Sequence, residues 1–353
     1  MKRTFWAVAT LSCAATAVLA QPKGHRPGSA LIYPLVARTA AEDTLLCVTN
    51  TNTSNILVPG YPVRRGDVRV PWKLVYAPEG TDRWSEVDGL LDLSPGDTFC
   101  ALASSFANLP STPLRGFFYV YAASPSGLGG GAIDFDFLTG EALVVGAAPA
   151  DYVFTLAAVP FKSEAGTNPN NPRNLQGWAY TDLNGNGRLD FDGREYVQFP
   201  DVLLQPFYLD QGAVPGNVLN DEIVLLLGRA DGADIRTTLS GNVWDNRETA
   251  FSFFGFTFFC WTRVRIRQLS GAVVFRTPRL QNNGSIEQFS GWINVRGANG
   301  VNIFTGQPTN NVPLLGAFIH RADIGARGFT TASLLWGSGA RGNEQDGFAF
   351  LNQ

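Results

Sequence analysis

Residues 251–268 read Phe-Ser-Phe-Phe-Gly-Phe-Thr-Phe-Phe-Cys-Trp-Thr-Arg-Val-Arg-Ile-Arg-Gln, and they form the longest run of β-favouring residues in the chain. Aromatic and β-branched side chains suit a pleated sheet, so the run predicts one long strand. Its even positions from Phe254 to Ile266 are mostly large and apolar. Its odd positions end in Trp261, Arg263, Arg265 and Arg267. Because successive side chains point to opposite faces of a strand, we expect the even positions in a core and an aromatic and basic stripe outside.

This stripe has two interpretations. Arg binds carboxylate and sulfate groups through two parallel hydrogen bonds, so the stripe is suited to hold an anionic polymer. Alternatively, it is an ordinary solvated strand face whose Arg residues pair with Asp or Glu on a neighbouring strand.

Shorter runs of Val, Ile, Phe and Tyr recur on both sides of this stretch, with clusters of Pro, Gly, Asn and Asp between them. The first set lies at Ala30–Val36, Thr44–Thr49, Val68–Tyr76, Thr98–Leu102, Gly116–Ala122, Ala132–Phe137 and Ala142–Val145. The second set includes Tyr152–Val159, Tyr196–Phe199, Val202–Tyr208, Glu222–Leu227, Ile235–Val243, Ala272–Phe275, Gly291–Val295, Leu314–Ile319 and Gly328–Leu335. Many short strands with turn signals between them are typical of a sandwich or barrel. The predicted fold class is all-β, with two antiparallel β-sandwich-like domains (immunoglobulin-like or jelly-roll-like) and little helix.

The first twenty residues have the features of a secretory signal peptide. Lys2 and Arg3 precede an apolar stretch from Phe5 to Leu19, and the chain reaches Ala20 through small and apolar residues. At about 15 residues the apolar stretch is short for a membrane span. We therefore expect cleavage after Ala20 and a secreted protein, extracellular or periplasmic, without a transmembrane segment. A buried N-terminal helix and a lipoprotein that uses Cys13 are the alternatives.

The remaining chain divides into three parts in this prediction. Residues 21–28 form a polar leader rich in Pro and Gly, residues 29–148 an N-terminal β-sandwich domain, and residues 149–353 a C-terminal one. The boundary is placed at Ala147-Ala148-Pro149-Ala150, where the β-type runs pause. A single extended sandwich over the same length is the alternative organisation.

Composition excludes several classes of protein. Charged residues make up 16 % of the chain and hydrophobic residues 45 %, which is enough apolar material for one large core or two medium ones. The formal net charge of −3 and the lack of a concentrated basic segment argue against nucleic-acid binding. With two His in the chain and no C-x-x-C spacing, a zinc site of the usual types is excluded as well.

Export makes a disulfide possible, since extracellular compartments are oxidising. Cys47, Cys100 and Cys260 follow the predicted signal peptide, so at most one internal pair can form. Cys47 and Cys100 both lie on predicted strands of the same half, and they are the pair we expect. Three buried thiols that act as small apolar residues are the alternative.

One motif predicts a site. Residues 182–195 read Asp-Leu-Asn-Gly-Asn-Gly-Arg-Leu-Asp-Phe-Asp-Gly-Arg-Glu, which matches the first nine positions of a calcium-binding loop. Calcium prefers six to eight oxygen ligands, and alternate residues of a tight loop point inward together. The predicted ligands are Asp182, Asn184, Asn186, Arg188 through its main-chain carbonyl, Asp190 and Glu195. The predicted role is structural, because no helices flank the loop.

Two departures weaken this match. The position of the usual bidentate Glu is Gly193, so that either Glu195 or Asp192 has to supply the missing carboxylate. Asn184-Gly185 and Asn186-Gly187 are also good type I′ turn pairs. The alternative is therefore a plain β-hairpin with acidic edges.

Other catalytic patterns are weak or missing. A Ser-His-Asp hydrolase needs a His beside its nucleophile, and His320 is the one serious candidate; no G-x-S-x-G motif accompanies it. A glycosidase needs only two nearby carboxylates. Asp134 and Asp136 lie two residues apart on one face of the predicted strand 132–137, about 7 Å apart at their Cα atoms. On an outward strand face, such residues are by default only solvated.

Several short motifs resemble the sequences of a group of uncharacterised secreted bacterial β-rich proteins. They are Leu31-Ile32-Tyr33-Pro34, residues 44–52, residues 93–99, residues 135–141, residues 182–196 and Phe258-Phe259-Cys260-Trp261. The resemblance implies export and a β architecture, and it implies no activity. In similar sequences the loop reads more like Asp-Leu-Asn-Gly-Asp-Gly, so Asn186 replaces an acidic residue here and lowers the charge available for calcium.

From the sequence we expect a non-catalytic, exported protein with a surface or extracellular binding or structural role, stabilised by calcium. Its partner is unknown, with a cell-surface or extracellular polymer as the candidate. The alternative function is a carbohydrate-active or other hydrolase that uses paired carboxylates. A binder should show exposed aromatic side chains over a flat face, whereas a hydrolase should show a cleft with two converging carboxyl groups. The aromatic residues to inspect are Trp72, Trp84, Trp178 and Trp292.

Overall fold

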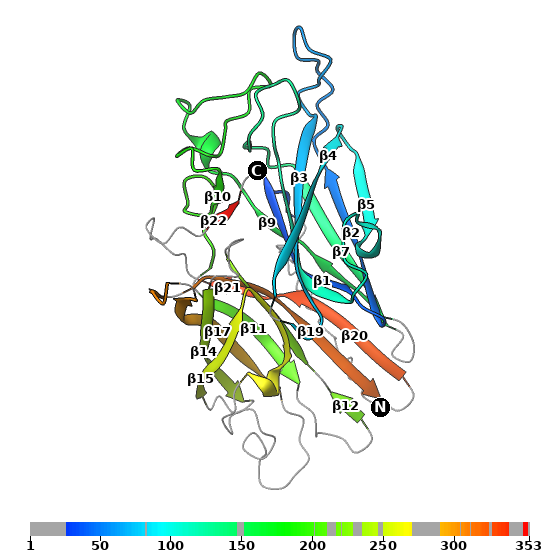
Figure 1. Ribbon diagram of the computed structural model, residues 1–353, viewed down its shortest axis with the longest axis vertical. Coiled ribbons are helices and arrows are strands. Elements are labelled where there is room, and N and C mark those ends of the chain that lie inside the picture. Colours follow the sequence, from blue (N-terminus) through cyan, green and yellow to red (C-terminus); the bar gives the residue numbers. More distant parts are fainter. Residues whose placement is uncertain are drawn as a thin grey trace, which may run out of the picture.

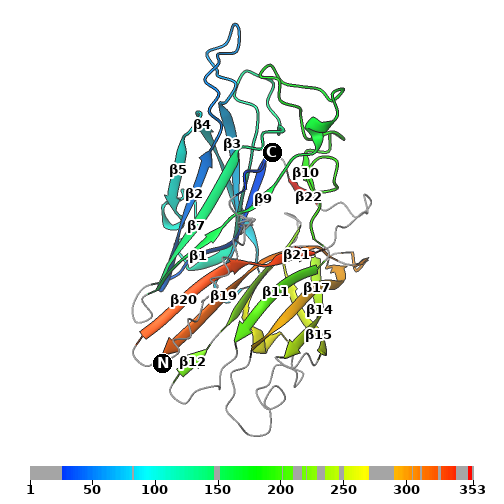
Figure 2. The ribbon, with the colours of Figure 1, turned by 180° about the vertical axis from the view of Figure 1, so that it is seen from behind.

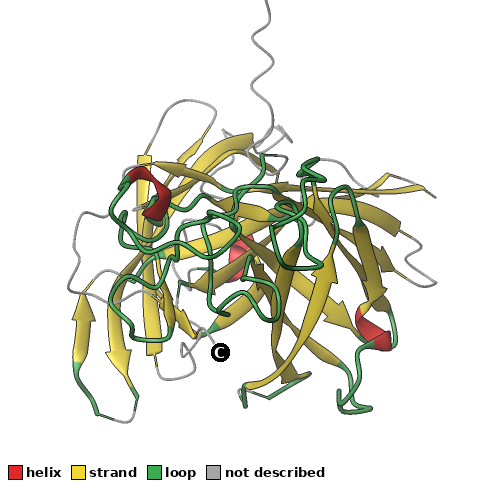
Figure 3. Ribbon diagram, turned by 90° about the horizontal axis from the view of Figure 1, so that it is seen from above, coloured by secondary structure: helices red, strands yellow, loops and turns green. Residues whose placement is uncertain are grey.

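The computed structural model describes residues 26–81, 83–146, 152–200, 202–209, 217–219, 221–228, 235–245, 250–269, 290–303, 305–310, 312–324, 327–338 and 349–351. The predicted signal peptide, most of the leader and the predicted strand Ala272–Phe275 lie outside these residues. Helix is confined, in the described part, to short 3-10 turns: η2 (Ala103–Ser105), η3 (Ala165–Thr167) and η5 (Ile266–Gln268). None of the described helices is long and apolar enough to cross a membrane. Strands account for nearly all of the regular structure (Figure 3).

Two sheets form the N-terminal part of the fold. One has the strand order β4-β3-β6-β1-β9 and the other the order β5-β2-β7-β8, with every pairing antiparallel. Their strands are β1 (Ala30–Arg38), β2 (Glu42–Asn50), β3 (Val68–Pro78), β4 (Ser85–Leu93), β5 (Thr98–Leu102), β6 (Leu114–Tyr121), β7 (Leu138–Gly146), β8 (Tyr152–Ala157) and β9 (Val159–Phe161). We call them the N-terminal sheets.

Two further sheets, which we call the C-terminal sheets, follow from residue 202 onward. One has the order β15-β14-β17-β11-β21, with β18 paired to β17; the other has the order β12-β19-β13-β16, with β20 paired to β19. Their strands are β11 (Val202–Leu209), β12 (Asn217–Leu219), β13 (Glu222–Leu227), β14 (Ile235–Asp245), β15 (Ala250–Phe259), β16 (Trp261–Arg265), β17 (Ser290–Asn302), β18 (Pro308–Asn310), β19 (Leu314–Ile324), β20 (Arg327–Leu334) and β21 (Trp336–Ser338). The predicted all-β, antiparallel, sandwich-like fold class is thus confirmed (Figures 1 and 2).

Three apolar clusters fill the spaces around these sheets. The first lies between the two N-terminal sheets and the second between the two C-terminal sheets. The third contains Ile32 and Phe117 from the N-terminal sheets together with Val224 and Leu315 from the C-terminal ones. The N-terminal and C-terminal sheets therefore share a core. This explains why β1 and β13, whose side chains are buried on both faces, are almost continuous apolar runs instead of alternating ones.

The change from one pair of sheets to the other does not coincide with the boundary predicted at residues 148–149. β8 pairs with β7, and β9 pairs with β1, although both strands follow that boundary. Residues 163–200 also contact the N-terminal sheets, for example through the bridge between Ile133 and Tyr180. The C-terminal sheets begin with β11, so the change falls at about residue 201.

The prediction of one long strand over residues 251–268 is wrong in two respects. β15 ends at Phe259, and Cys260 has a φ of 48°, in the left-handed region. β16 then begins at Trp261 in the other C-terminal sheet and ends at Arg265. Within β15 a bulge at Gly255, whose φ is 126°, also reverses the alternation, so that Phe253 is buried and Phe254 is 61 % exposed.

The outward stripe expected on this run is also absent from the described residues. Trp261 is buried, and its indole N–H donates to the Pro34 carbonyl at 2.7 Å. The Arg263 side chain is 7 % exposed and forms ion pairs with Glu42 and Glu222. Arg265 is exposed, and the side chain of Arg267 lies outside the described part. Arg263 pairs with Glu222 of the neighbouring strand β13, which is the kind of pairing that the second interpretation expected.

Two smaller predictions also differ. Residues 132–137 form isolated bridges and a turn instead of a strand, and β4 was not expected. The disulfide prediction is confirmed: Cys47 of β2 and Cys100 of β5 are directly opposite in the sheet and are bonded, and Cys260 is buried and takes no part in this bond.

Candidate functional site

The predicted calcium loop lies between two buried residues that contact each other. The hydroxyl oxygens of Thr181 and Tyr196 are 3.2 Å apart, and both side chains are fully buried. Within the loop, β10 (Arg188–Asp190) pairs with β22 (Ala349–Leu351) near the other end of the chain. Because β10 has no partner strand inside the loop, residues 182–195 do not form the plain hairpin considered as the alternative.

The first half of the loop is organised by side-chain oxygens that accept main-chain N–H groups. The Asp182 carboxylate accepts hydrogen bonds from the N–H groups of Asn186 and Gly187, both at 3.0 Å. Asn186 Oδ1 in turn accepts the Arg188 N–H at 2.8 Å. Gly185 and Gly187 have φ values of 69° and 70°, which glycine adopts without a steric penalty. The sequence D-x-N-G-N-G thus folds into a tight series of turns with its polar side chains gathered inside.

The second half brings in two carboxylates. Asp190 Oδ2 accepts the side-chain amides of Asn184 and Asn186, at 2.6 and 2.8 Å. Glu195 is 1 % exposed, and its oxygens accept the N–H groups of Leu183 at 2.8 Å and Asp190 at 3.3 Å. Burial, together with the charges of Asp190 and Asp182, raises the pKa of Glu195 to about 8. The loop therefore holds a carboxyl group whose ionisation is costly.

Five of the six predicted ligands meet in this loop: Asp182, Asn184, Asn186, Asp190 and Glu195. The sixth, Arg188, lies on β10 beside them. Asp192, the other candidate for the missing carboxylate, instead accepts the main-chain N–H groups of Arg194 and Glu195. In the part of the chain that the structure describes, His, Cys, Asp and Glu side chains form no group of three at metal-binding spacing. Any cation would therefore depend on the oxygens of the two Asn side chains as well as on the carboxylates.

A second candidate site lies on the outward face of the sheet β15-β14-β17-β11. Trp244 of β14 and Trp292 of β17 are directly opposite in register, and their rings stack with centroids 3.4 Å apart and planes 4° apart. Trp292 is 37 % exposed. The inward neighbours Val243 and Ile293 belong to the core between the C-terminal sheets, which leaves the two indoles on the other face.

Polar side chains extend this aromatic pair along the same face. Asn242 and Asn294 are the next outward pair; Asn294 Oδ1 accepts the Asn242 N–H at 2.7 Å, and Ser252 Oγ donates to Asn242 Oδ1 at 2.8 Å. Arg296 follows, with its Nε 3.3 Å from Ser240 Oγ. We call this set the aromatic face: Ser240, Asn242, Trp244, Ser252, Trp292, Asn294 and Arg296.

The other three Trp residues singled out in the sequence are packing residues. Trp72 contacts Phe106 edge-on, and Trp84 contacts Trp261 in the same way. Trp178 packs against Phe135 and donates its indole N–H to the Arg65 carbonyl at 3.0 Å. The sequence gives no sign that Trp244 lies beside Trp292, because only the pairing of β14 with β17 brings the two together.

The carboxylates considered for hydrolysis are engaged in holding a loop. Asp136 accepts the Ser29 hydroxyl at 2.7 Å and the Ser163 N–H at 3.0 Å. Asp134 accepts a main-chain hydrogen bond from Gly166; burial and the charge of Asp136 raise its pKa to about 6. Both carboxylates thus fix residues 163–166 against the N-terminal sheets.

His320 is also held by its neighbours. Its Nδ1 lies 3.1 Å from Asp221 Oδ2, and its Nε2 lies 3.3 Å from Gln205 Nε2. Both ring nitrogens therefore face side chains of neighbouring strands and segments of the C-terminal sheets.

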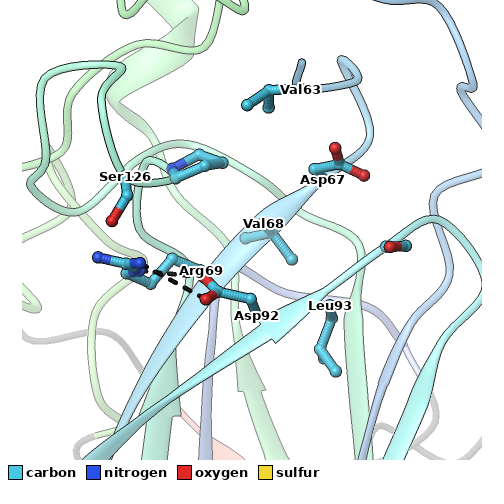
Figure 4. A pocket seen from close by; sticks show the side chains of 9 residues that line it. Val63, Asp67, Val68, Arg69, Asp92, Leu93 and Ser126 are labelled. Atoms are coloured by element: carbon cyan, nitrogen blue, oxygen red, sulfur yellow. Dashed lines mark hydrogen bonds and ion pairs between the residues drawn. The ribbon is translucent and has the colours of Figure 1, made fainter.

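A small open pocket of about 240 Å³ lies at the end of β3 and β4 (Figure 4). Asp67, Arg69, Asp92 and Ser126 contribute its polar groups, and Arg69 Nε forms an ion pair with Asp92 Oδ1 at 3.0 Å. The pocket is smaller than typical small-molecule sites of about 300–1,000 Å³. Asp92 is paired with Arg69, and Asp67 Oδ2 accepts the Arg64 main-chain N–H at 2.6 Å, so the two carboxylates of this pocket are engaged separately.

Comparison with known proteins shows a partial likeness. No protein-family model matches the chain, and no curated protein is significantly similar to it. Among solved structures, the "Crystal Structure of Thermotoga maritima 1070" aligns with 37 % of this chain and 93 % of that chain, at 9 % sequence identity and a TM-score of 0.25. A likeness of this degree carries no argument about function.

Proposed function

We propose that the protein is an exported, non-catalytic binding protein that holds an extracellular carbohydrate polymer on the aromatic face. The observation that supports this best is the stacked, outward-pointing pair of Trp244 and Trp292. A large, rigid aromatic side chain with an exposed edge offers apolar contact area at little cost in conformational entropy. Sugar rings present apolar C–H faces together with hydroxyl groups, and they suit such a surface.

The polar neighbours of the pair support the same class of ligand. Asn242, Asn294 and Ser252 supply amide and hydroxyl groups that both donate and accept hydrogen bonds. Arg296 adds a charged donor that binds carboxylate or sulfate groups of acidic sugars. The residues follow the strands in register, so the surface is extended rather than concave, as a polymer requires.

In this proposal the loop 182–195 binds calcium and has a structural role. Its ligands would be Asp182, Asn184, Asn186, the Arg188 carbonyl, Asp190 and Glu195, all of them oxygen donors as calcium prefers. Glu195 is buried beside Asp182 and Asp190 in this loop, and a bound cation would offset both the cost of its burial and the repulsion between the carboxylates. The Asn184 and Asn186 amide groups now donate to Asp190; a half-turn of each amide would present its oxygen instead.

Affinity gel electrophoresis tests the binding function. The purified protein is run through gels that contain neutral or acidic polysaccharides, and we expect retardation by at least one of them. Trp292→Ala should abolish the retardation, because it removes the exposed ring. Leu90→Ala is the matched control, since Leu90 is an exposed apolar residue of β4 outside the aromatic face. Equal retardation of both variants, or none for the unmodified protein across the panel, would refute the proposal.

A further inference from the structure

Residues 51–67 form a hairpin between β2 and β3 that projects from the end of the N-terminal sheets, at the top of Figures 1 and 2. Leu57 and Arg64 form an antiparallel bridge within it. At its tip, residues 58–61 read Val-Pro-Gly-Tyr, and the Tyr61 N–H donates to the Val58 carbonyl at 3.0 Å. Gly60 has a φ of 81°, as the third residue of a type II turn requires. The Pro-Gly sequence therefore determines the shape of the tip.

The hairpin presents large apolar side chains to solvent. Ile56 and Leu57 are 61 % and 62 % exposed, and Tyr61 is 40 % exposed. Pro59 and Pro62, between and beside them, are exposed as well. Isolated apolar residues on a surface are ordinary, but several together on one projecting segment indicate an interaction site.

Side-chain hydrogen bonds to the main chain hold the base of the hairpin in place. Nε2 of buried Gln176 donates to the carbonyls of Arg64 and Asp67, both at 2.8 Å. The Trp178 indole donates to the Arg65 carbonyl, and Asn50 Nδ2 donates to the Gly66 carbonyl at 2.8 Å. Side chains from two other segments thus hold the main chain at the point where the hairpin leaves the sheet.

Basic residues outnumber acidic ones on the hairpin. Residues 51–67 contain Arg64 and Arg65, both exposed, and one acid, the half-buried Asp67 at the base, whose Oδ2 accepts the Arg64 main-chain N–H at 2.6 Å. Arg64 lies opposite Leu57, and the Arg65 N–H donates to the Ile56 carbonyl at 2.8 Å, so the basic and apolar residues lie at the same level of the hairpin. Arg binds phosphate groups through its planar fork of N–H donors. Leu175, which is 55 % exposed and adjacent to Gln176, adds a further apolar side chain near the base.

We propose that this hairpin binds the surface of an anionic lipid bilayer. The turn at residues 59–62 enters the boundary between headgroups and acyl chains, Ile56 and Leu57 follow it, and Arg64 and Arg65 bind lipid phosphates beside them. Exposed apolar and basic side chains on one projecting segment suit a membrane interface, because Arg side chains lay their apolar stems along such a surface and extend their charged ends to the phosphates. The hairpin projects from the body of the protein, so it can insert into a planar, deformable bilayer, and no complementary groove is needed. The proposal is independent of the polymer-binding function.

Vesicle flotation tests it with large unilamellar vesicles of phosphatidylcholine alone or mixed equally with phosphatidylglycerol. The full secreted chain should float with the mixed vesicles, and less so at high salt because screening weakens the Arg contacts. Leu57→Asp should weaken binding about tenfold or more, as expected for the loss of one buried Leu side chain. Arg64→Glu with Arg65→Glu should abolish the preference for the anionic lipid.

Matched variants separate the hairpin from general effects. Leu90→Asp changes an equally exposed apolar residue on β4, and Arg265→Glu reverses an exposed charge on β16; both should bind as the unmodified protein does. An environment-sensitive dye on Ile56→Cys should shift to the blue when vesicles are added, whereas the same dye on Leu90→Cys should not. The proposal is overturned by the absence of vesicle binding, by unchanged binding of Leu57→Asp, or by a hairpin that binds a protein and no vesicle.

Discussion

Nη1 of Arg263 in β16 lies 2.8 Å from Oε1 of Glu42 in β2, and this ion pair joins a C-terminal sheet to an N-terminal one. Both side chains are almost fully buried, and Arg263 also pairs with Glu222 on the neighbouring strand at 2.8 Å. Tyr152 donates its hydroxyl to the same Glu42 carboxylate. Burial alone raises the pKa of Glu42, but the charge and hydrogen bonds of Arg263 and the hydrogen bond of Tyr152 bring it below its ordinary value.

Removal of the Arg263 charge should destabilise the whole molecule. Arg263→Met takes the main positive partner from buried Glu42, which keeps Tyr152 and the more distant Arg115, and from half-buried Glu222, and we expect the free energy of unfolding to fall by about 3–5 kcal/mol. Chemical denaturation followed by fluorescence measures this. Arg265→Met, two residues along at an exposed position, should change it by less than about 0.5 kcal/mol. Similar values for the two variants would show that the ion pair does not join the sheets energetically.

Asp134 should make stability depend on pH. Its pKa in the folded protein is about 6, above the ordinary value, so the folded state favours the protonated form. Stability is therefore greatest below the pKa of the unfolded chain and is lost as pH rises through about 6. Asp134→Asn mimics the protonated form, so it should be more stable than the unmodified protein at pH 7 and equally stable near pH 4. Denaturation curves at both values test this, and the prediction fails if Asp134→Asn gives the same difference at each.

Calcium should raise the melting temperature of the protein. A ligand that binds only the folded state adds about 2.7 kcal/mol when its concentration is 100 times its Kd. Asp182→Ala removes a predicted ligand and should abolish the response, whereas Asp88→Ala, an exposed acid on β4, should retain it. Differential scanning calorimetry in millimolar calcium and in chelator gives the answer. An identical melting temperature in both solutions would exclude a calcium site.

The disulfide should contribute strongly to stability. Cys47 and Cys100 are 53 residues apart in sequence, and in the chain-entropy model a loop of this length corresponds to about 4 kcal/mol. The variant with Cys47→Ala and Cys100→Ala should lose most of this amount, and a reductant should then have no further effect on it. A thiol-reactive dye added to the unfolded, unreduced protein from which residues 1–20, and with them Cys13, have been removed should label Cys260 alone. Labelling of further positions would contradict the observed pairing.

The sequence predicts the all-β class well, because alternation and turn residues act locally. In the neighbouring pairs Val243–Trp244 and Trp292–Ile293, for example, the aliphatic residue is the one that faces the core. It could not predict that Trp244 stacks on Trp292, since the register between β14 and β17 depends on contacts 48 residues apart in sequence. The alternation across residues 251–268 gave a wrong prediction of one long strand for a related reason. A bulge at Gly255 and a left-handed residue at Cys260 each shift the period by local backbone geometry.

The calcium motif also has one part that the sequence predicts and one part that it does not. The turns at Gly185 and Gly187 and the gathering of Asp182, Asn184 and Asn186 follow from the local pattern. The pairing of β10 with β22 does not follow from the local pattern, because Arg188 and its partner Leu351 are 163 residues apart in the sequence. That long-range pairing is what distinguishes the loop from a hairpin.

The position of the disulfide has a consequence for association between copies of the chain. β5 is the edge strand of its sheet and only five residues long, and β2 is the strand it covers. An uncovered β2 would offer a row of unpaired main-chain groups to a strand of another molecule. The bond from Cys47 to Cys100 holds the short cover in place, so oxidation keeps the longer strand β2 paired and leaves only the five-residue β5 at this edge, where another molecule finds few main-chain groups to pair with.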